Sequence, residues 1–148
     1  MSALTRIDAV VDALVELCRT ATGLQVVDGP FVGELDDNVL ILGVPDGSTP
    51  GYTTTPTRQQ GMGRAHLREA WEVRCLLLLS GGDDVHALRA QAAAHIGALD
   101  DALRDVSAAS LAWDRAGVAG SNMSWVPVQG PTGAVMAVLF SFEGESLL

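Results

Sequence analysis

The residues best suited to metal chemistry are three histidines and two cysteines, and their spacing argues against a metal site. His86 and His95 fall nine positions apart in a stretch with helical periodicity, which places them on opposite sides of a helix. His66 stands apart from both. Cys18 and Cys75 each lie in an apolar stretch, so we expect buried free thiols and no disulfide. We predict no metal and no cofactor.

A second candidate is the glycine-rich turn 80–84, Ser-Gly-Gly-Asp-Asp, which joins a predicted strand to a predicted helix. Phosphate-binding loops occur at such junctions. This turn lacks the Gly-Lys-Ser/Thr ending, and its two carboxylates would repel a phosphate, so we interpret it as a tight turn with an aspartate capping the helix. Asp36, Asp37 and Asp46 lack the spacing of a calcium loop. With no nucleophile motif either, we predict no catalytic residues and no enzyme.

The tryptophans point to packing and contact rather than to catalysis. Trp71 falls on the apolar face of a predicted strand and is expected in the core. Trp113 is followed by Asp114 and Arg115, and an aromatic residue beside an arginine is typical of protein interfaces. We keep two roles open for Trp113, an interface contact and core packing, with core packing preferred.

Composition limits the classes of partner. The chain has 148 residues, a length that predicts one domain, and a net charge of −9 with arginine as its only basic type. Counterion release needs a clustered basic surface, so this charge argues against a nucleic-acid binder. No apolar run approaches the ~20 residues of a membrane span, and the N-terminus has no signal-peptide pattern. We expect a soluble protein kept in the cytoplasm in which it is made.

Hydrophobic periodicity predicts an α+β fold, with a single mixed or antiparallel sheet and two helices packed on it. The expected order is α-β-β-(long loop)-β-α-β-β. We expect helices at 5–21, ended by Gly23, and at 85–106, and strands at 24–28, 39–44, 70–79, 118–128 and 134–142, with another strand beginning at 111–113.

Residues 45–69 are the exception to this periodicity. The segment is rich in threonine, proline and glycine and has no apolar stripe, which predicts a long flexible loop. It holds Tyr52 and three of the nine arginines, Arg58, Arg64 and Arg68. We expect this loop to become ordered against an acidic surface of a neighbouring subunit.

Six short blocks, in this order and spacing, resemble the tail terminator (tail completion, minor tail) proteins of siphophages, especially those of actinobacterial hosts. They are Ile-Asp-Ala-Val-Val-Asp-Ala-Leu at 7–14, Val-Val-Asp-Gly-Pro at 26–30, Asp-Asn-Val-Leu-Ile-Leu-Gly-Val at 37–44, Trp-Glu-Val-Arg-Cys at 71–75, Leu-Ser-Gly-Gly-Asp-Asp at 79–84 and Leu-Asp-Asp-Ala-Leu-Arg at 99–104. Together with the order of elements, the blocks extend the resemblance over most of the chain.

The resemblance implies a virion protein that forms a hexameric ring on the head-proximal end of a phage tail tube. Such a ring stops tube growth and joins the tail to the head–neck complex, so its partners are further copies of the chain, the tail tube protein and a connector or neck protein. DNA passes through the lumen without specific binding. The residues proposed to contact a neighbouring subunit or the tube are Tyr52, Arg58, Arg64, Arg68, Trp113 and Arg115.

Two alternatives stay open from the sequence. Another neck or head-completion protein of a phage would share the same class of role. A cellular ligand-binding or adaptor domain would show a pocket in place of a ring.

Overall fold

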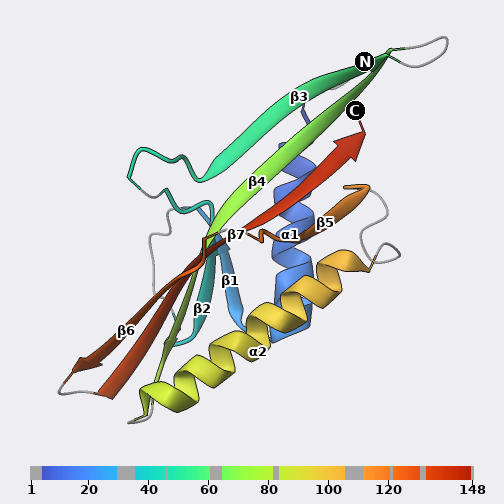
Figure 1. Ribbon diagram of the computed structural model, residues 1–148. Coiled ribbons are helices and arrows are strands. Elements are labelled where there is room, and N and C mark those ends of the chain that lie inside the picture. The colour runs from blue at the N-terminus through green and yellow to red at the C-terminus, as the bar shows by residue number, and fades with distance from the viewer. Residues whose placement is uncertain are drawn as a thin grey trace.

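A computed structural model describes residues 5–29, 36–45, 47–60, 65–81, 84–105, 112–120, 122–130 and 133–147 (Figure 1). The two helices and seven strands are, in chain order, α1 (Ile7–Thr22), β1 (Gln25–Asp28), β2 (Val39–Leu42), β3 (Tyr52–Gln60), β4 (Ala65–Ser80), α2 (Val85–Arg104), β5 (Arg115–Val118), β6 (Ser124–Gly130) and β7 (Gly133–Leu147). The strands form one mixed sheet with both helices packed on it, so the predicted α+β class is confirmed.

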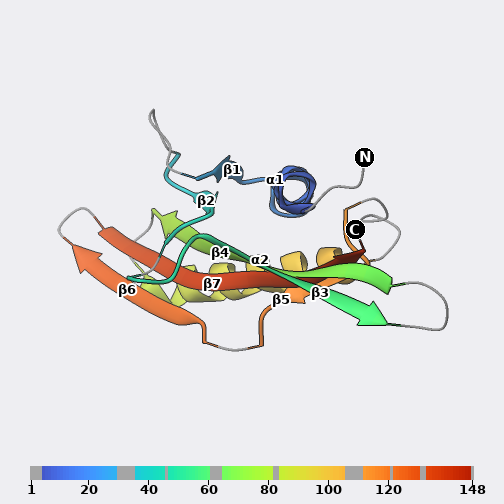
Figure 2. The same cartoon turned by 90° about the horizontal axis from the view of Figure 1, so that it is seen from above.

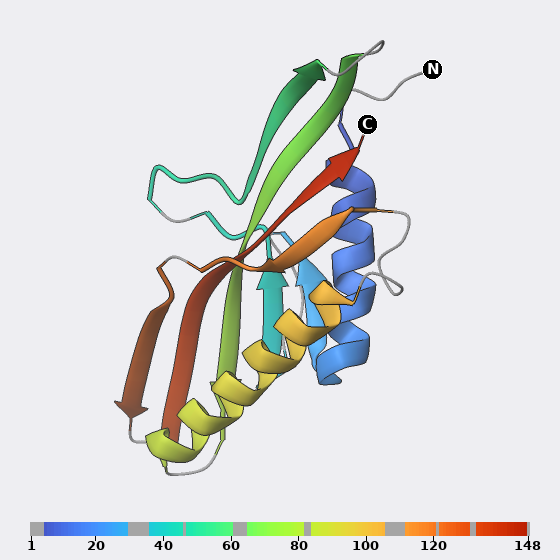
Figure 3. The same cartoon turned by 45° about the vertical axis from the view of Figure 1, so that its right-hand side comes forward.

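The sheet is built around two long antiparallel strands, β4 and β7. Along the outer side of β4 lie β2 and β3, one after the other, and along the outer side of β7 lie β6 and β5. β1 pairs with β2 in parallel and completes the order β1-β2-β4-β7-β5. Figure 3 shows that β4 runs from the β3 hairpin at one end to the β6–β7 end at the other. Any surface formed by these two strands therefore spans the whole sheet.

The first helix is fixed at both of its ends. The hydroxyl of Thr5 accepts a hydrogen bond from the Ile7 amide, at 3.1 Å, and the buried carboxylate of Glu69 accepts one from the Arg6 amide, at 2.9 Å. Gly23 ends the helix with φ +69°, the left-handed conformation that glycine adopts without strain. The predicted C-terminal signal is confirmed, and Glu69 ties the start of α1 to β4.

The second helix provides the larger apolar stripe. Asp84 caps it, with its carboxylate accepting from the His86 amide at 2.9 Å, as predicted for an aspartate in this turn. One face of the helix is buried on the sheet through residues spaced three or four apart: Leu88, Ala92, Ile96, Leu99 and Leu103.

The core lies between the helices and one face of the sheet. The odd-numbered residues of β4 from Trp71 to Leu79 are buried there, which confirms the predicted alternation. Cys18 from α1 and Cys75 from β4 belong to this core as free thiols. Burial raises the pKa of the Cys18 thiol to about 12. Both cysteines are therefore packing residues, as expected.

The expectation of a long loop at 45–69 is wrong, because β3 and the start of β4 form a hairpin there. Four of the β3 residues are β-branched threonines, which favour strands, but every residue at 52–57 is exposed and none gives an apolar stripe. The strand is held by pairing with β4. Pro56 is compatible with that pairing because β3 is an edge strand.

The single irregular strand expected at 118–128 is two strands, β5 and β6, which pair with different parts of β7. Between them Asn122 adopts φ +42°, a conformation that no regular strand contains. No strand begins at 111–113: Leu111 lies outside the described residues, and β5 starts at Arg115. The last strand extends to Leu147, beyond the predicted end at residue 142.

Candidate subunit interface on the uncovered sheet face

The face of the sheet opposite the core carries no helix within the described part of the chain. It consists of the even-numbered residues of β4, the odd-numbered residues of β7 and their cross-strand partners. Figure 2 shows the sheet from above, with β3, β5 and β6 on the side away from α1. An antiparallel sheet commonly leaves one face to solvent, and such a face is normally polar. Here it divides into two unlike halves.

One half, the apolar half, lies where β2, β4, β7 and β6 run side by side. The register places ten apolar side chains in neighbouring rows: Val27, Val39, Ile41, Leu76, Leu78, Val126, Val128, Val135, Ala137 and Leu139. Val126 and Val128 are 46% and 52% exposed, whereas Val39 is buried. An exposed group of apolar side chains on a sheet is typical of a contact surface.

The outer strand of this half, β6, is exposed on both of its faces. On the side of the helices, Trp125 remains 37% exposed. Pro127 lies in the middle of β6, opposite Met136 of β7. Because proline has no N–H, it is tolerated in an edge strand where its nitrogen faces solvent and not the neighbouring strand. Pro56 occupies the corresponding place in β3 on the opposite edge. The edge strands β3 and β6 therefore each lack a central donor, which hinders the addition of another strand to either of them.

The other half, the polar half, lies where β3, β4, β7 and β5 run side by side. Small residues, Ala70 and Gly117 among them, leave a hollow of about 500 Å³ in this half. Its lining includes the carboxylates of Glu72, Glu143 and Glu145. Arg104 and Arg115 lie on its β5 side, and Thr53 and Thr55 on its β3 side.

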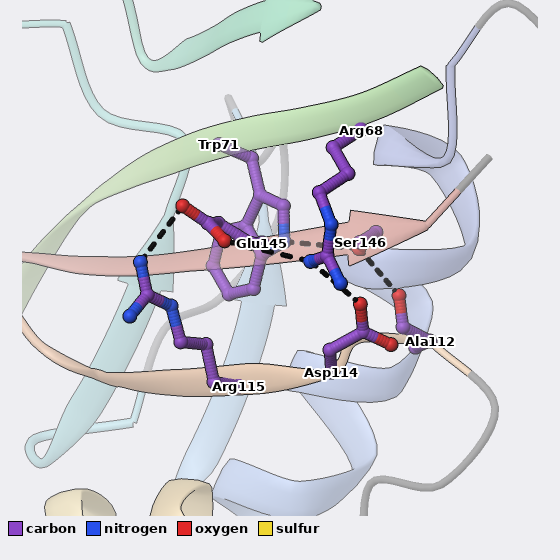
Figure 4. A network of polar contacts seen from close by, with 7 residues as sticks. All are labelled: Arg68, Trp71, Ala112, Asp114, Arg115, Glu145 and Ser146. Atoms are coloured by element: carbon purple, nitrogen blue, oxygen red, sulfur yellow. Dashed lines mark hydrogen bonds and ion pairs between the residues drawn. The ribbon is translucent and has the colours of Figure 1, made fainter. Parts of the chain in front are cut away.

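A network of ion pairs closes one end of the polar half (Figure 4). Arg68 contacts Asp114 at 3.1 Å and Glu145 at 3.7 Å, and Arg115 contacts the other oxygen of Glu145 at 2.8 Å. Arg115 is 75% exposed at its side chain, so each pair contributes only about 0.2–1 kcal/mol. The network orients these side chains more than it stabilises the fold.

Below the network, on the core side, the strands are held by buried groups. Trp71 donates from its indole nitrogen to the Ser146 hydroxyl at 3.2 Å, and Ser146 donates to the Ala112 carbonyl at 2.6 Å. The Trp71 ring lies against Gly144, where a Cβ atom would come within 2.4 Å of it. Its centroid is 5.7 Å from that of Trp113. This packing fills the space under the polar half and leaves no room for a side chain at Gly144.

Between the two halves, the chain turns away from the edge of β4 at the end of β2 and comes back to the same edge as β3. Tyr52 fixes this crossing, since its hydroxyl donates to the carboxylate of Asp28 and its ring occupies the space beside Gly43. Gly43 has φ +76° and leaves no room there for a side chain. Burial, followed by the bond to Asp28, raises the pKa of Tyr52 above its ordinary value.

The structure brings only part of the sequence-predicted interface together. Arg68 and Arg115 meet through Glu145, whereas Tyr52 lies at the base of the hairpin and contacts β1. Trp113 is 5% exposed, so it packs in the core of this chain. The remaining two are Arg58, placed in β3 by its backbone, and Arg64, which lies outside the described residues.

Sequence reasoning missed the carboxylates of the polar half and the valines of β6. Glu72 and Glu143 are far apart in sequence and become neighbours only through the pairing of β4 with β7. The alternation of Val126 and Val128 could have indicated one face of a strand, but the proline between them argued against a regular strand there.

Metal and membrane roles gain no support from these residues. Among the described histidines, cysteines and carboxylates, no group of three is arranged to hold a metal ion. None of the described helices has the length and apolar character needed to cross a bilayer.

Comparison with known proteins supports the fold alone. No protein-family model and no curated protein matches the chain. Among solved structures, it is similar to a chain of the virion of the native gene transfer agent (GTA) particle, with a TM-score of 0.52 and 14% sequence identity. The similarity covers 99% of this chain and 100% of that chain. The whole fold described above is therefore shared with a component of a virion particle.

Proposed function

We propose that this chain is a structural virion protein that caps the head-proximal end of a phage-like tail tube as a hexameric ring. It stops tube polymerisation and joins the tail to the head–neck complex, and DNA passes through its lumen without specific binding. The observation that carries the proposal is the uncovered sheet face, with exposed valines at one end and a charged hollow at the other. A subunit of a ring needs two such surfaces for its neighbours and its tube.

Two further observations support a role in assembly. The fold matches a chain of the GTA virion over its full length. The sequence resembles tail terminators in six blocks, two of which cover the middle and the C-terminal end of β4. Because these blocks carry turns and core residues and no reactive groups, the same evidence favours a structural protein over an enzyme.

One observation favours a different class, the cellular ligand-binding domain. The hollow of the polar half is large enough for a small molecule, and a ligand-binding domain requires such a space. The hollow is open and lined mainly by charged and small side chains, whereas ligand pockets are mostly apolar. A ring contact therefore explains its lining better.

Tail length in particles made without this chain tests the proposal. We expect inactivation of its gene to give tail tubes of uncontrolled length and no joined particles, measured by negative-stain electron microscopy. Complementation with the intact gene is the control. Tails of normal length beside separate filled heads would instead assign the chain to the neck. Unchanged, infectious particles would exclude both roles.

A further inference from the structure

Net charge limits which surfaces of this chain can meet in an assembly. At a net charge of −9, two copies repel each other wherever their carboxylates come face to face. Surface carboxylates lie along α1, before β2 and around the hollow of the polar half: Asp8, Asp12, Glu16, Asp36, Asp37, Glu72 and Glu143. Two large surfaces of the described part of the chain lack carboxylates. They are the apolar half and the outward side of α2 over residues 85–99.

The apolar half is uncharged throughout. Its segments of β2, β4, β7 and β6 are residues 39–42, 76–80, 133–140 and 124–130, and none of them contains an ionisable side chain. One row of residues crosses all four strands: Val39, Leu78, Ala137 and Val126. The exposed valines of β6 extend this surface to the edge of the sheet. Contact with a partner here desolvates hydrocarbon and no charge.

The outward side of α2 is unlike that of α1. No aspartate or glutamate occurs from Val85 to Leu99, and Arg89 is the only arginine there. Most of the exposed positions have small side chains: Ala87, Ala90, Ala93, Ala94 and Gly97. The outward side of a solvated helix is normally charged, as that of α1 is. Small side chains allow another surface to approach the helix axis closely.

We infer that the apolar half of one copy of this chain receives the outward side of α2, residues 87–98, of a second copy. Twelve helical residues are about 18 Å long, and a helix is about 10–12 Å wide. The four strands of the apolar half are about 14 Å across, and the residues from Val135 to Leu139 extend about 17 Å along β7. The two surfaces therefore agree in size, and large side chains on the sheet meet small ones on the helix.

The contact can form only between copies. The buried side of α2, from Leu88 to Leu103, packs on the odd-numbered residues of β4, whereas Leu76 and Leu78 of the apolar half lie on the other face of the sheet. Since helix and sheet contribute different surfaces, the contact is heterologous and generates a closed ring or an open filament. The inference rests on the proposed ring and names the surfaces that hold it.

A single charge placed on either surface tests the inference in the full-length chain. Val126→Arg alters the apolar half, and Ala94→Arg alters the outward side of α2. Each substitution changes every contact of a homogeneous ring, so we expect self-association to weaken by about tenfold or more in sedimentation velocity. In an equimolar mixture, the α2 of Val126→Arg and the apolar half of Ala94→Arg are both unaltered. That one contact should give heterodimers and nothing larger.

The matched controls add the same charge outside both surfaces. Thr54→Arg lies in the exposed edge strand β3, and Ala9→Arg lies on the exposed side of α1. Both should associate like the unaltered chain, and thermal melts of all four variants check that each is folded. An unaltered chain that stays monomeric, a mixture without heterodimers, or equal weakening by the controls overturns the inference.

Cross-linking gives a second measurement that adds no charge. With a photo-cross-linking residue at Val128 in a mixture of 14N- and 15N-labelled protein, we expect cross-links to residues 87–98 of the other copy. Cross-links to β6 of the other copy would mean that two apolar halves pack face to face, and cross-links to any other segment would assign a different partner surface. Either result overturns the inference, whereas the proposed function is decided separately by tail length in electron microscopy.

Discussion

The apolar half and the polar half of the uncovered face lie on the same two strands, yet different forces shape them. In the apolar half, rows of Val, Ile and Leu cross β2, β4, β7 and β6 above a core of the same kind of residue. In the polar half, carboxylates and arginines on β4, β7 and β5, with threonines on β3, lie above Trp71 and Gly144. Hydrocarbon contacts depend little on direction, whereas charged hydrogen bonds do.

The difference teaches how one sheet can present two kinds of contact. In the proposed ring, burial of the apolar half would contribute affinity that tolerates small displacements of a partner. In the proposed ring, pairing in the polar half would select the partner and its register, because like charges repel and opposite charges must meet. The boundary between the halves lies at Arg74, whose backbone bonds Gly43, Val44 and Gly51 as the chain passes from β2 to β3.

The largest expected effect comes from the layer below both halves. Leu99→Ala in α2 should lower the free energy of unfolding by about 2–5 kcal/mol, because Leu99 is fully buried and its loss leaves a cavity. Leu147→Ala is the matched control, since Leu147 is 44% exposed and its truncation should change stability by less than about 0.5 kcal/mol. Urea melts measure both. A loss of less than about 0.5 kcal/mol for Leu99→Ala would show that Leu99 does not contribute to the core.

A smaller effect should distinguish the polar half from the apolar half. Gly144→Ala forces a Cβ atom into the Trp71 ring and the Arg115 carbonyl, and we expect a loss of about 1–3 kcal/mol. Gly97→Ala is a control of opposite sign, because Gly97 is an exposed helical residue with open space around it and alanine favours the helix by about 1 kcal/mol. Thermal melts of the two variants should move in opposite directions. A neutral Gly144→Ala would show that the space between Gly144 and Trp71 is not tightly filled.

The crossing between the halves is tested by Tyr52→Phe, which removes the bond to Asp28 and keeps the ring against Gly43. We expect a loss of about 0.5–1.5 kcal/mol at neutral pH. Because folding raises the pKa of Tyr52, its stabilisation is complete below the ordinary tyrosine pKa near 10 and is lost as pH rises above it.

Stability measurements on the unaltered chain and on Tyr52→Phe, above the ordinary tyrosine pKa, test the direction of this pH dependence. The unaltered chain should lose stability steeply, and Tyr52→Phe should lose less, in urea melts followed by circular dichroism. The same alkaline slope in both would assign it to other groups.

The smallest effect concerns the surface ion pairs. Arg115→Ala should cost about 0.2–1 kcal/mol, and this cost should decrease in high salt because the guanidinium is largely exposed. Arg19→Ala, which removes an exposed pair with Glu16 on α1, is the control for a generic salt effect. A larger, salt-insensitive loss for Arg115→Ala would mean that the network holds β5 in place.

Much of the fold was predictable because burial leaves a periodic record. The stripe of α2 and the alternation from Trp71 to Leu79 were both read correctly. The helix signals at Gly23 and Asp84 were correct as well, since each serves a local backbone need. β3 was missed because its described side chains, at 52–57, are exposed on both faces and its stability comes from pairing with β4, which leaves no pattern in a single segment.

The candidate site was less predictable for a related reason. Arg68 and Arg115 stood out as scarce positive charges in an acidic chain, and the structure joins them through Glu145. That carboxylate, like Glu143, carried no signal among eighteen acidic residues. Only the register of β4 against β7 places it opposite Ala70 and beside the hollow.

The uninterrupted pairing of β4 with β7, from Arg68 opposite Leu147 to Ser80 opposite Val135, has a mechanical consequence. The hydrogen bonds of an antiparallel pair run perpendicular to the strands. A force that slides one strand past the other therefore loads the whole ladder in shear, and the bonds must yield together. Force applied across the strands opens the ladder one bond at a time. A subunit pulled along β4 should resist far more tension than one peeled from the side, and optical-tweezer experiments with handles along and across this strand would measure that anisotropy.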